Sequence, residues 1–140
     1  KPDILLTHWG NDPTNMDHQV TSRGAYRAAS IAAMPGFEHR MGKVFYPVIY
    51  GFEPSVPHND ITGFCPDHYV VIDEVFDIKM KALAALRSQS KLVSYYTQWA
   101  EYRGFQARVW AGQPVRYAEA FQCLTAVVDT RLPGRLPKLA

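Results

Sequence analysis

Residues 3–18 read Asp3-Ile4-Leu5-Leu6-Thr7-His8-Trp9-Gly10-Asn11-Asp12-Pro13-Thr14-Asn15-Met16-Asp17-His18. The apolar run at 4–6 lies between Pro2 and the turn-forming residues 10–13, so a buried strand is predicted at 3–7. This run has no alternation of polar and apolar residues, which is typical of a parallel sheet covered on both faces. The stretch therefore predicts a strand, a polar loop and the start of a helix, the repeating unit of an α/β fold.

The rest of the chain continues to alternate strands and helices. Strands are predicted at 44–52, 69–72 and 115–124, and helices at 19–34, 74–88 and 92–102. Pro47 indicates an edge or a bulge in the second strand, and Gly104 is expected to end the last helix. The loop at 53–66 is long for a compact domain, and long loops are often functional.

The composition fits one globular domain and excludes several classes of function. Of the 140 residues, 47% are hydrophobic and 20% are charged, and the net charge is +2. That charge is too small to predict binding to nucleic acid or to an anionic membrane. No apolar run is long enough for a transmembrane helix. Cys65 and Cys123 are expected to be free thiols in a reducing compartment, with one disulfide as the alternative, so a cytoplasmic location is predicted.

Four side chains of the metal-ligand type are concentrated after the first strand: His8, Asp12, Asp17 and His18. Open α/β sheets bind ligands at the carboxyl ends of their strands, and imidazole and carboxylate groups are ordinary zinc ligands. The spacing matches no established zinc motif. Two interpretations therefore stay open: a metal site, or an Asx turn in which Asp17 caps the following helix.

Three further features have both a structural and a functional interpretation. His58 lies in the long loop, where contact with solvent or substrate is favoured over metal ligation. Glu119 lies in an apolar segment, so it either pairs with an arginine such as Arg116 or Arg103, or faces solvent on an edge strand. Aromatic residues recur at helical spacing in 92–102 and favour a core or a subunit interface over a substrate platform; they are Tyr95, Tyr96, Trp99 and Tyr102.

Two strings in the first loop, Leu-Thr-His-Trp at 6–9 and Asn-Met-Asp-His at 15–18, resemble the second metal motif of the LmbE-like (PIG-L) family of zinc enzymes. The similarity continues in the same order along nearly the whole chain. Its further segments are 52–54, 67–73 before the helix with Lys79, 88–89, 103–104 and 117–121. One motif would be weak evidence, whereas this ordered series is strong evidence for the family.

The resemblance implies a Rossmann-like α/β fold with a mostly parallel sheet flanked by helices and one zinc ion at its carboxyl edge. His18 corresponds to a zinc ligand, and Asp17 lies beside it. The remaining ligands and the general base of family members come from an Ala-His-Pro-Asp-Asp-Glu-type motif near their N-terminus, which has no counterpart in this sequence. We therefore expect 1–131 to be the C-terminal portion of a single LmbE-like domain whose N-terminal strands are missing here, and 132–140 to be a loose tail.

The resemblance also bears on the reaction. Most family members are N-deacetylases, in which a histidine at the position of Asn15 either protonates the leaving amine or stabilises the oxyanion. Asn15 can donate a hydrogen bond but cannot deliver a proton. The sequence is closer to the branch that hydrates an unsaturated oxo-dicarboxylate, such as 4-oxalomesaconate, in aromatic-acid breakdown. It shares the pattern at 12–18 and the segments 95–97 and 103–107, although Met16 stands where that branch has tyrosine.

These observations predict a zinc-dependent hydratase of a small-molecule substrate, with an N-deacetylase as the alternative. Asp17 and Asn15 are the candidate catalytic residues, and His18 is the candidate metal ligand. His8, His58 and Arg23 are the candidate substrate-binding residues. A third hypothesis is a catalytically incomplete chain that needs the missing N-terminal half or a homo-oligomer partner for its site and its stability.

Overall fold

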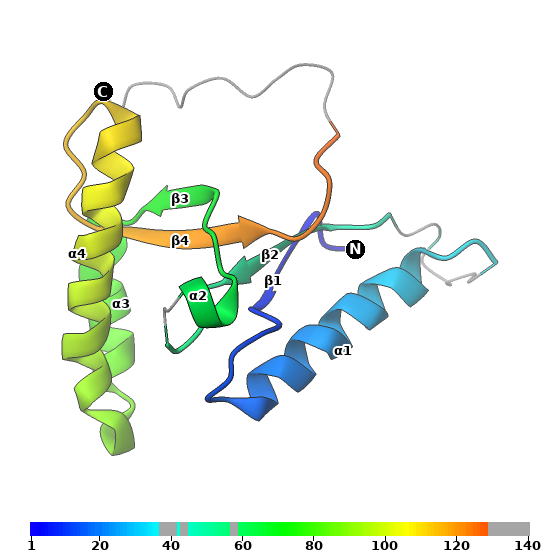
Figure 1. Ribbon diagram of the computed structural model, residues 1–140, viewed down its shortest axis with the longest axis horizontal. Coiled ribbons are helices and arrows are strands. Elements are labelled where there is room, and N and C mark those ends of the chain that lie inside the picture. Colours follow the sequence, from blue (N-terminus) through cyan, green and yellow to red (C-terminus); the bar gives the residue numbers. More distant parts are fainter. Residues whose placement is uncertain (37–41, 43–44, 57–58, 129–140) are drawn as a thin grey trace. The chain divides into compact units, whose positions relative to one another are not determined.

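The computed structural model describes residues 1–36, 42, 45–56 and 59–128, so the predicted tail at 132–140 and His58 lie outside the described residues. A four-stranded open sheet is flanked by helices in a mixed α/β fold (Figure 1). The strands are β1 (Ile4–His8), β2 (Val48–Phe52), β3 (His68–Val71) and β4 (Ala118–Cys123), and their order in the sheet is β1-β2-β4-β3. The α-helices are α1 (Met16–Ala33), α2 (Asn59–Thr62), α3 (Phe76–Ala84) and α4 (Lys91–Ala111), and short 3₁₀ turns occur at Asp73–Val75 and Arg87–Gln89.

The sheet is mostly antiparallel, so the prediction of a mostly parallel sheet is wrong. β1 and β2 pair in parallel, whereas β4 runs antiparallel to β2. Backbone hydrogen bonds from Asp67 to Phe121 and from Ile72 to Tyr117 give β3 and β4 opposite directions as well. An unbroken apolar run indicates that a strand is covered, but the direction of a neighbouring strand depends on the path of the connections.

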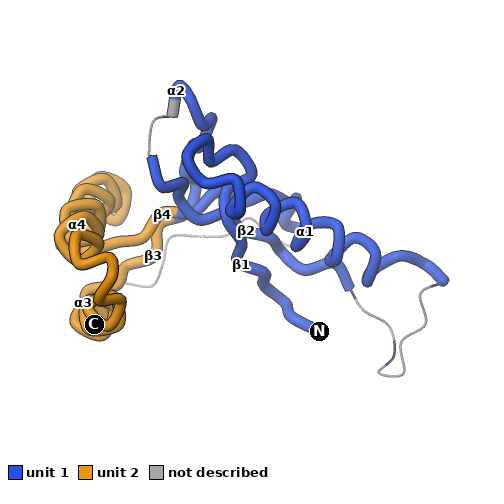
Figure 2. Tube along the Cα trace, turned by 90° about the horizontal axis from the view of Figure 1, so that it is seen from below, with its two compact units in different colours: residues 1–68, 121–129 blue, residues 69–120, 130–140 orange. Residues whose placement is uncertain are grey.

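The described chain forms two compact units, shown in different colours in Figure 2. In the first unit, residues 1–68 and 121–129, Ile49 and Phe64 are fully buried. The Trp9 ring packs edge-on against Phe64, and its Nε1 donates a 2.8 Å hydrogen bond to the carbonyl of Thr62. A Cβ added at Gly51 would lie 3.0 Å from the Trp9 ring, so this glycine allows the indole to approach β2. These contacts fix the start of the loop after β1.

β1 is an edge strand of the described sheet. Ile4 and Leu6 are 58% and 55% exposed, so the prediction that this strand is buried on both faces is not met within the described residues. Both side chains point to the same face of the strand, because successive residues of a strand alternate in direction. Thr7, on the opposite face, is buried.

In the second unit, residues 69–120 and 130–140, α4 packs closely against the segment that leads into β4. A Cβ at Gly104 would lie 2.1 Å from the carbonyl oxygen of Arg116, closer than any side chain can approach. Gly104 therefore lies inside α4, and the prediction that it ends this helix is wrong. The helix ends instead at Gly112, whose φ of 65° is the left-handed conformation that glycine adopts most readily.

Polar contacts also hold the second unit together. The carboxylate of Asp73 accepts hydrogen bonds from the backbone N–H groups of Arg116 and Tyr117. Glu119 forms a 2.5 Å ion pair with Lys79, so the predicted arginine partners are wrong. An apolar segment shows that a carboxylate needs a partner but not which cation reaches it, and Lys79 lies on α3, far away in the sequence.

Three other expectations can be compared with the described residues. Cys65 and Cys123 are free thiols. The rings of Tyr95, Trp99 and Tyr102 stack in sequence along α4. No helix of the described chain is both long and apolar enough to cross a membrane, and the cytoplasmic location stays a prediction.

Candidate functional site

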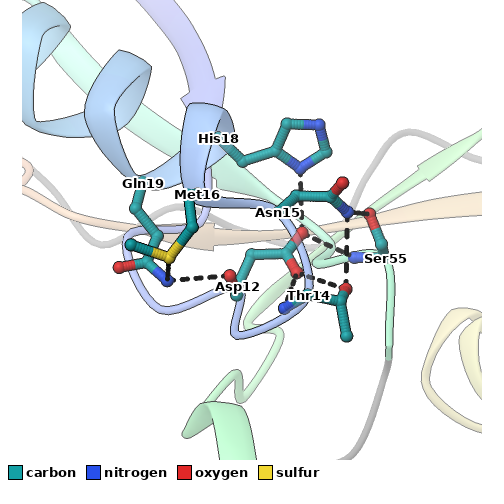
Figure 3. A network of polar contacts seen from close by, with 7 residues as sticks. All are labelled: Asp12, Thr14, Asn15, Met16, His18, Gln19 and Ser55. Carbon is teal, nitrogen blue, oxygen red and sulfur yellow. Dashed lines mark hydrogen bonds and ion pairs between the residues drawn. The ribbon is translucent and has the colours of Figure 1, made fainter.

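The loop after β1 is the centre of the candidate site. β1 ends at His8, and α1 begins at Met16, three residues before the predicted start of the helix. Asn15 occupies the N-cap position, so the interpretation of Asp17 as the cap is wrong. The earlier start places His18 in the first turn of α1, where its side chain can turn back over the loop (Figure 3).

A buried carboxylate, Asp12, organises this loop (Figure 3). Its Oδ1 accepts hydrogen bonds from the backbone N–H and the hydroxyl of Thr14, at 3.3 and 3.0 Å. Its Oδ2 accepts the backbone N–H of Ser55 at 3.0 Å and lies 2.8 Å from Nδ1 of His18. One side chain thus joins the β1–α1 loop, the first turn of α1 and the loop after β2.

The ionisation of Asp12 determines which nitrogen of His18 carries hydrogen. Burial by itself would raise the pKa of Asp12, but the hydrogen bonds from Ser55, His18 and Thr14 outweigh it and hold this pKa far below its usual value of 3.8. An ionised carboxylate can only accept, so Nδ1 of His18 must be the donor. Nε2 of a neutral His18 then carries a lone pair and faces away from Asp12.

His8 forms the second wall of the site. Its ring stacks on that of His18 with the centroids 3.8 Å apart, and it makes an edge-type contact with Phe52 at a centroid distance of 4.5 Å. Burial lowers the pKa of His8, and the neighbouring His18 lowers it further, while the charges of Asp17 and Asp12 act in the opposite direction. The neutral imidazole of His8 is therefore favoured, which allows two histidine rings to stack without repulsion.

Asn15 is held by the loop that follows β2. Its Nδ2 donates a 2.6 Å hydrogen bond to Oγ of Ser55 and a longer one to Oγ1 of Thr14. Gln19 donates to the carbonyl of Asp12, which fixes the backbone of the loop against α1. Ser55 thus contacts both Asp12 and Asn15.

Ser55 was not among the residues predicted for the site, and Asp12 was not predicted to position another side chain. Ser55 lies 40 residues or more from its partners in the chain, and only its place in a long loop directly after a strand could have drawn attention to it. For Asp12 the signal was present, because a carboxylate six residues before a histidine can orient its imidazole through a hydrogen bond to one ring nitrogen. A turn motif does not show which side chain the carboxylate will reach.

The other predicted site residues have different surroundings. Asp17 is exposed in the first turn of α1, outside the hydrogen-bond network drawn in Figure 3. Arg23 is exposed five residues beyond His18, which on an α-helix is roughly 140° around the axis. The structure thus brings His8, Asn15 and His18 together and leaves Arg23 on another side of α1. The roles of all these residues stay predictions.

The described residues offer one well-oriented metal ligand. Nε2 of His18, backed by a buried carboxylate on Nδ1, has the arrangement that metal-binding histidines commonly show. Both oxygens of Asp12 are already occupied by donors, so this residue fits an orienting role better than ligation. Among the described ranges, no group of three histidine, cysteine or acidic side chains is arranged to hold a metal ion. A zinc site that uses His18 would therefore need ligands beyond these residues.

Comparison with known proteins first defines the class of fold. No family model matches the chain. The structure resembles the conserved protein TT1542 from Thermus thermophilus, with 24% identity, a TM-score of 0.65 and coverage of 92% of this chain and 54% of that one. It also resembles an N,N′-diacetylchitobiose deacetylase from Pyrococcus horikoshii, with 20% identity, a TM-score of 0.63 and coverage of 88% and 46%. At these identities the likeness concerns the fold alone.

Two more similar relatives are hydratases. The chain is homologous to a 4-oxalmesaconate hydratase from Pseudomonas putida KT2440, with 32% identity over 136 residues, which cover 94% of this chain and 52% of that protein. Its structure matches that of GalB, the 4-carboxy-2-hydroxymuconate hydratase of the same organism, with a TM-score of 0.85, 32% identity and coverage of 94% and 56%. The chain thus spans about half the length of the relatives it matches.

Proposed function

We propose that this protein hydrates an unsaturated oxo-dicarboxylate of the 4-oxalomesaconate type and that the β1–α1 loop provides one side of its active site. The observation that carries the proposal is the buried Asp12 carboxylate that orients His18 at the carboxyl end of β1. The similarity to two hydratases over 94% of the chain supports the reaction class.

The residues of the loop fit this chemistry. Zinc, when bound, would lower the pKa of a coordinated water molecule and polarise a substrate oxygen. His18 would be one ligand through Nε2, with its ring orientation fixed by Asp12. The neutral ring of His8 and the edge of Phe52 would form an apolar wall beside the alkene of the substrate.

Asn15 and Asp17 take the proposed catalytic roles. Hydration adds the hydroxyl group of water to one alkene carbon and a proton to the other, so no amine leaves. Asn15 therefore needs only to donate a hydrogen bond to a substrate oxygen that gains negative charge. Asp17, exposed beside His18, is proposed to accept a proton from the attacking water and to return it to the second alkene carbon, so that one water molecule is added overall. Deacetylation would additionally require a proton donor to the leaving amine, which an asparagine cannot provide.

The test compares two histidines in the purified protein of full natural length. Conversion of 4-oxalomesaconate is followed by loss of the absorbance of its conjugated system, and bound zinc is measured by elemental analysis. His18→Ala is expected to lose at least about a hundredfold in kcat/KM and to retain less zinc, because ligand and orientation are lost together.

His68→Ala is the matched control, because His68 also has a carboxylate on Nδ1, that of Asp67, but lies exposed at the start of β3. It is expected to keep both activity and zinc. Release of acetate from N-acetylated amines with no hydration would replace this proposal by the deacetylase alternative. Equal behaviour of the two histidine variants would show that the β1–α1 loop is not the active site.

A further inference from the structure

The C-terminal half of α4 carries an apolar stripe that nothing in the described chain covers. Its side chains recur at i, i+3 and i+7 and are 46%, 58% and 68% exposed: Tyr102, Phe105 and Val109. The opposite face of the same helix holds the residues that pack inside the second unit: Ala100, Arg103, Gly104 and Ala107. The helix therefore has two faces, and only one of them is packed against the described residues of the unit.

Two opposite charges border this stripe on the same side. Glu101 and Arg108 are seven residues apart, which is two turns of helix, so they lie on one edge of the stripe roughly 10 Å apart along the axis. That separation is too large for them to pair with each other. No salt bridge reaches either residue within the described part of the chain. The guanidinium of Arg108 lies over the ring of Phe105 at 5.6 Å, at the edge of the stripe.

We propose that this stripe is an interface between two copies of the chain, in which two α4 helices pack antiparallel around a two-fold axis near Phe105. In an antiparallel helix pair, flanking residues of the same heptad position face one another across the seam. Glu101 of one copy then lies opposite Arg108 of the second copy, and the two-fold axis repeats the pair. In a parallel pair the two-fold axis would run along the helices and place the two copies of Glu101 on opposite edges of the seam, so Glu101 and Arg108 could not pair with each other between the copies.

The charge pattern is the reason for choosing a second copy as the occupant. The stripe is self-complementary, because it carries one acidic and one basic residue at positions that a two-fold axis exchanges. Three apolar side chains make a small contact, well below the area of a standard stable interface. The association through α4 is therefore expected to be weak, with a dissociation constant in the micromolar range.

Charge reversal provides the test, in the full-length protein studied by sedimentation velocity over a concentration series. Glu101→Arg alone and Arg108→Glu alone place like charges across the seam and are expected to weaken association at least about tenfold. The double variant Glu101→Arg with Arg108→Glu restores opposite charges and is expected to regain most of the wild-type affinity. Phe105→Asp is expected to abolish the contact, because it places two carboxylates near the axis.

Circular dichroism and melting temperature verify that each variant folds, and the double variant gives a positive result that an unfolded protein could not give. The proposal is overturned if the wild type stays monomeric at roughly 100 micromolar, far above the expected dissociation constant. It is also overturned if the assembly state is the same in wild type, Glu101→Arg and Phe105→Asp, which would place any association on another surface. Failure of the double variant to regain association would exclude the antiparallel pairing.

Discussion

The molecule contains two histidine–aspartate pairs with nearly the same geometry and very different surroundings. His18 and Asp12 are joined at 2.8 Å in the β1–α1 loop, and His68 and Asp67 at 2.6 Å at the start of β3. The side chain of Asp12 is 1% exposed, whereas that of Asp67 is 49% exposed. The distance between the two groups therefore does not separate a candidate catalytic pair from a surface pair.

The two pairs differ in burial and in how many other groups donate hydrogen bonds to the carboxylate. Asp12 receives hydrogen bonds from two further residues, Thr14 and Ser55, and these keep its charge fixed out of contact with water. Among the described residues Asp67 has one further donor, the backbone N–H of Cys123, and its side chain stays in contact with solvent. Water screens an exposed pair, and only a buried carboxylate imposes one ring orientation and one tautomer on its histidine.

The largest effect on stability is expected when the charge of the buried Asp12 carboxylate is removed. Asp12→Asn should lower the free energy of unfolding by about 3 kcal/mol, because the donors that surround the carboxylate lose an ionised acceptor. Asp67→Asn should lower it by about 0.5 kcal/mol or less. Urea denaturation at pH 7 measures both. Equal losses would mean that burial does not distinguish the two pairs.

The second prediction concerns pH. The pKa of Asp12 is lowered on folding, so its charged form stabilises the native state above its ordinary value of 3.8, and this contribution is lost as the pH falls below that value toward the folded pKa. The stability difference between wild type and Asp12→Asn should therefore be constant from pH 7 to about pH 5 and shrink below about pH 4. Denaturation curves for both proteins at each pH measure this difference. A difference that does not change with acid would contradict the role of the charge.

A smaller effect is expected for the hydroxyl of Ser55, which links the loop after β2 to the site. Ser55→Ala removes the hydroxyl that accepts the 2.6 Å bond from the Asn15 amide and that also bonds to the Asp12 carboxylate, and it keeps the backbone N–H that bonds to Asp12. The expected loss of stability is about 1 kcal/mol. If Asn15 contacts the substrate, kcat should fall by a larger proportion than the stability does. Ser94→Ala on α4 is the control, since within the described part of the chain this hydroxyl accepts a single long, exposed bond from Gln98, and its loss should change neither quantity.

The smallest effect is the coupling energy of the exposed pair. A double-mutant cycle on His68 and Asp67 should give no more than about 0.5 kcal/mol and should decrease with added salt. The same cycle on His18 and Asp12 should exceed about 1 kcal/mol and depend little on salt, because these groups are largely shielded from ions. Similar salt dependence in the two cycles would remove the distinction between the pairs.

Much of the local structure could be predicted from the sequence. The first strand, the polar loop and the following helix are present, because an apolar run, turn residues and helical periodicity act within a few residues of one another. The concentration of His8, Asp12, Asp17 and His18 after the first strand was predicted for the same reason. The helix start was three residues late in the prediction, since Asn15 rather than Asp17 occupies the N-cap.

The errors concern contacts between distant segments. Gly104 has the sequence signature of a helix end, but the carbonyl of Arg116 approaches it so closely that only glycine fits inside α4. Glu119 required a cation, and the partner proved to be Lys79 of α3. In both cases the residue type was informative, and its partner was decided by how α3, α4 and β4 pack.

The sequence by itself determined the succession of strands and helices and the cluster of polar residues after the first strand, because hydrophobic period and turn chemistry are local properties of the chain. Only the tertiary structure decided the antiparallel course of β4, the exposed apolar stripe of α4 and the contact of Ser55 with Asp12. These depend on which surfaces meet when segments more than 40 residues apart pack together. The orientation of His18 combines both levels, because a local turn brings Asp12 to its ring and a distant loop completes the burial of that carboxylate.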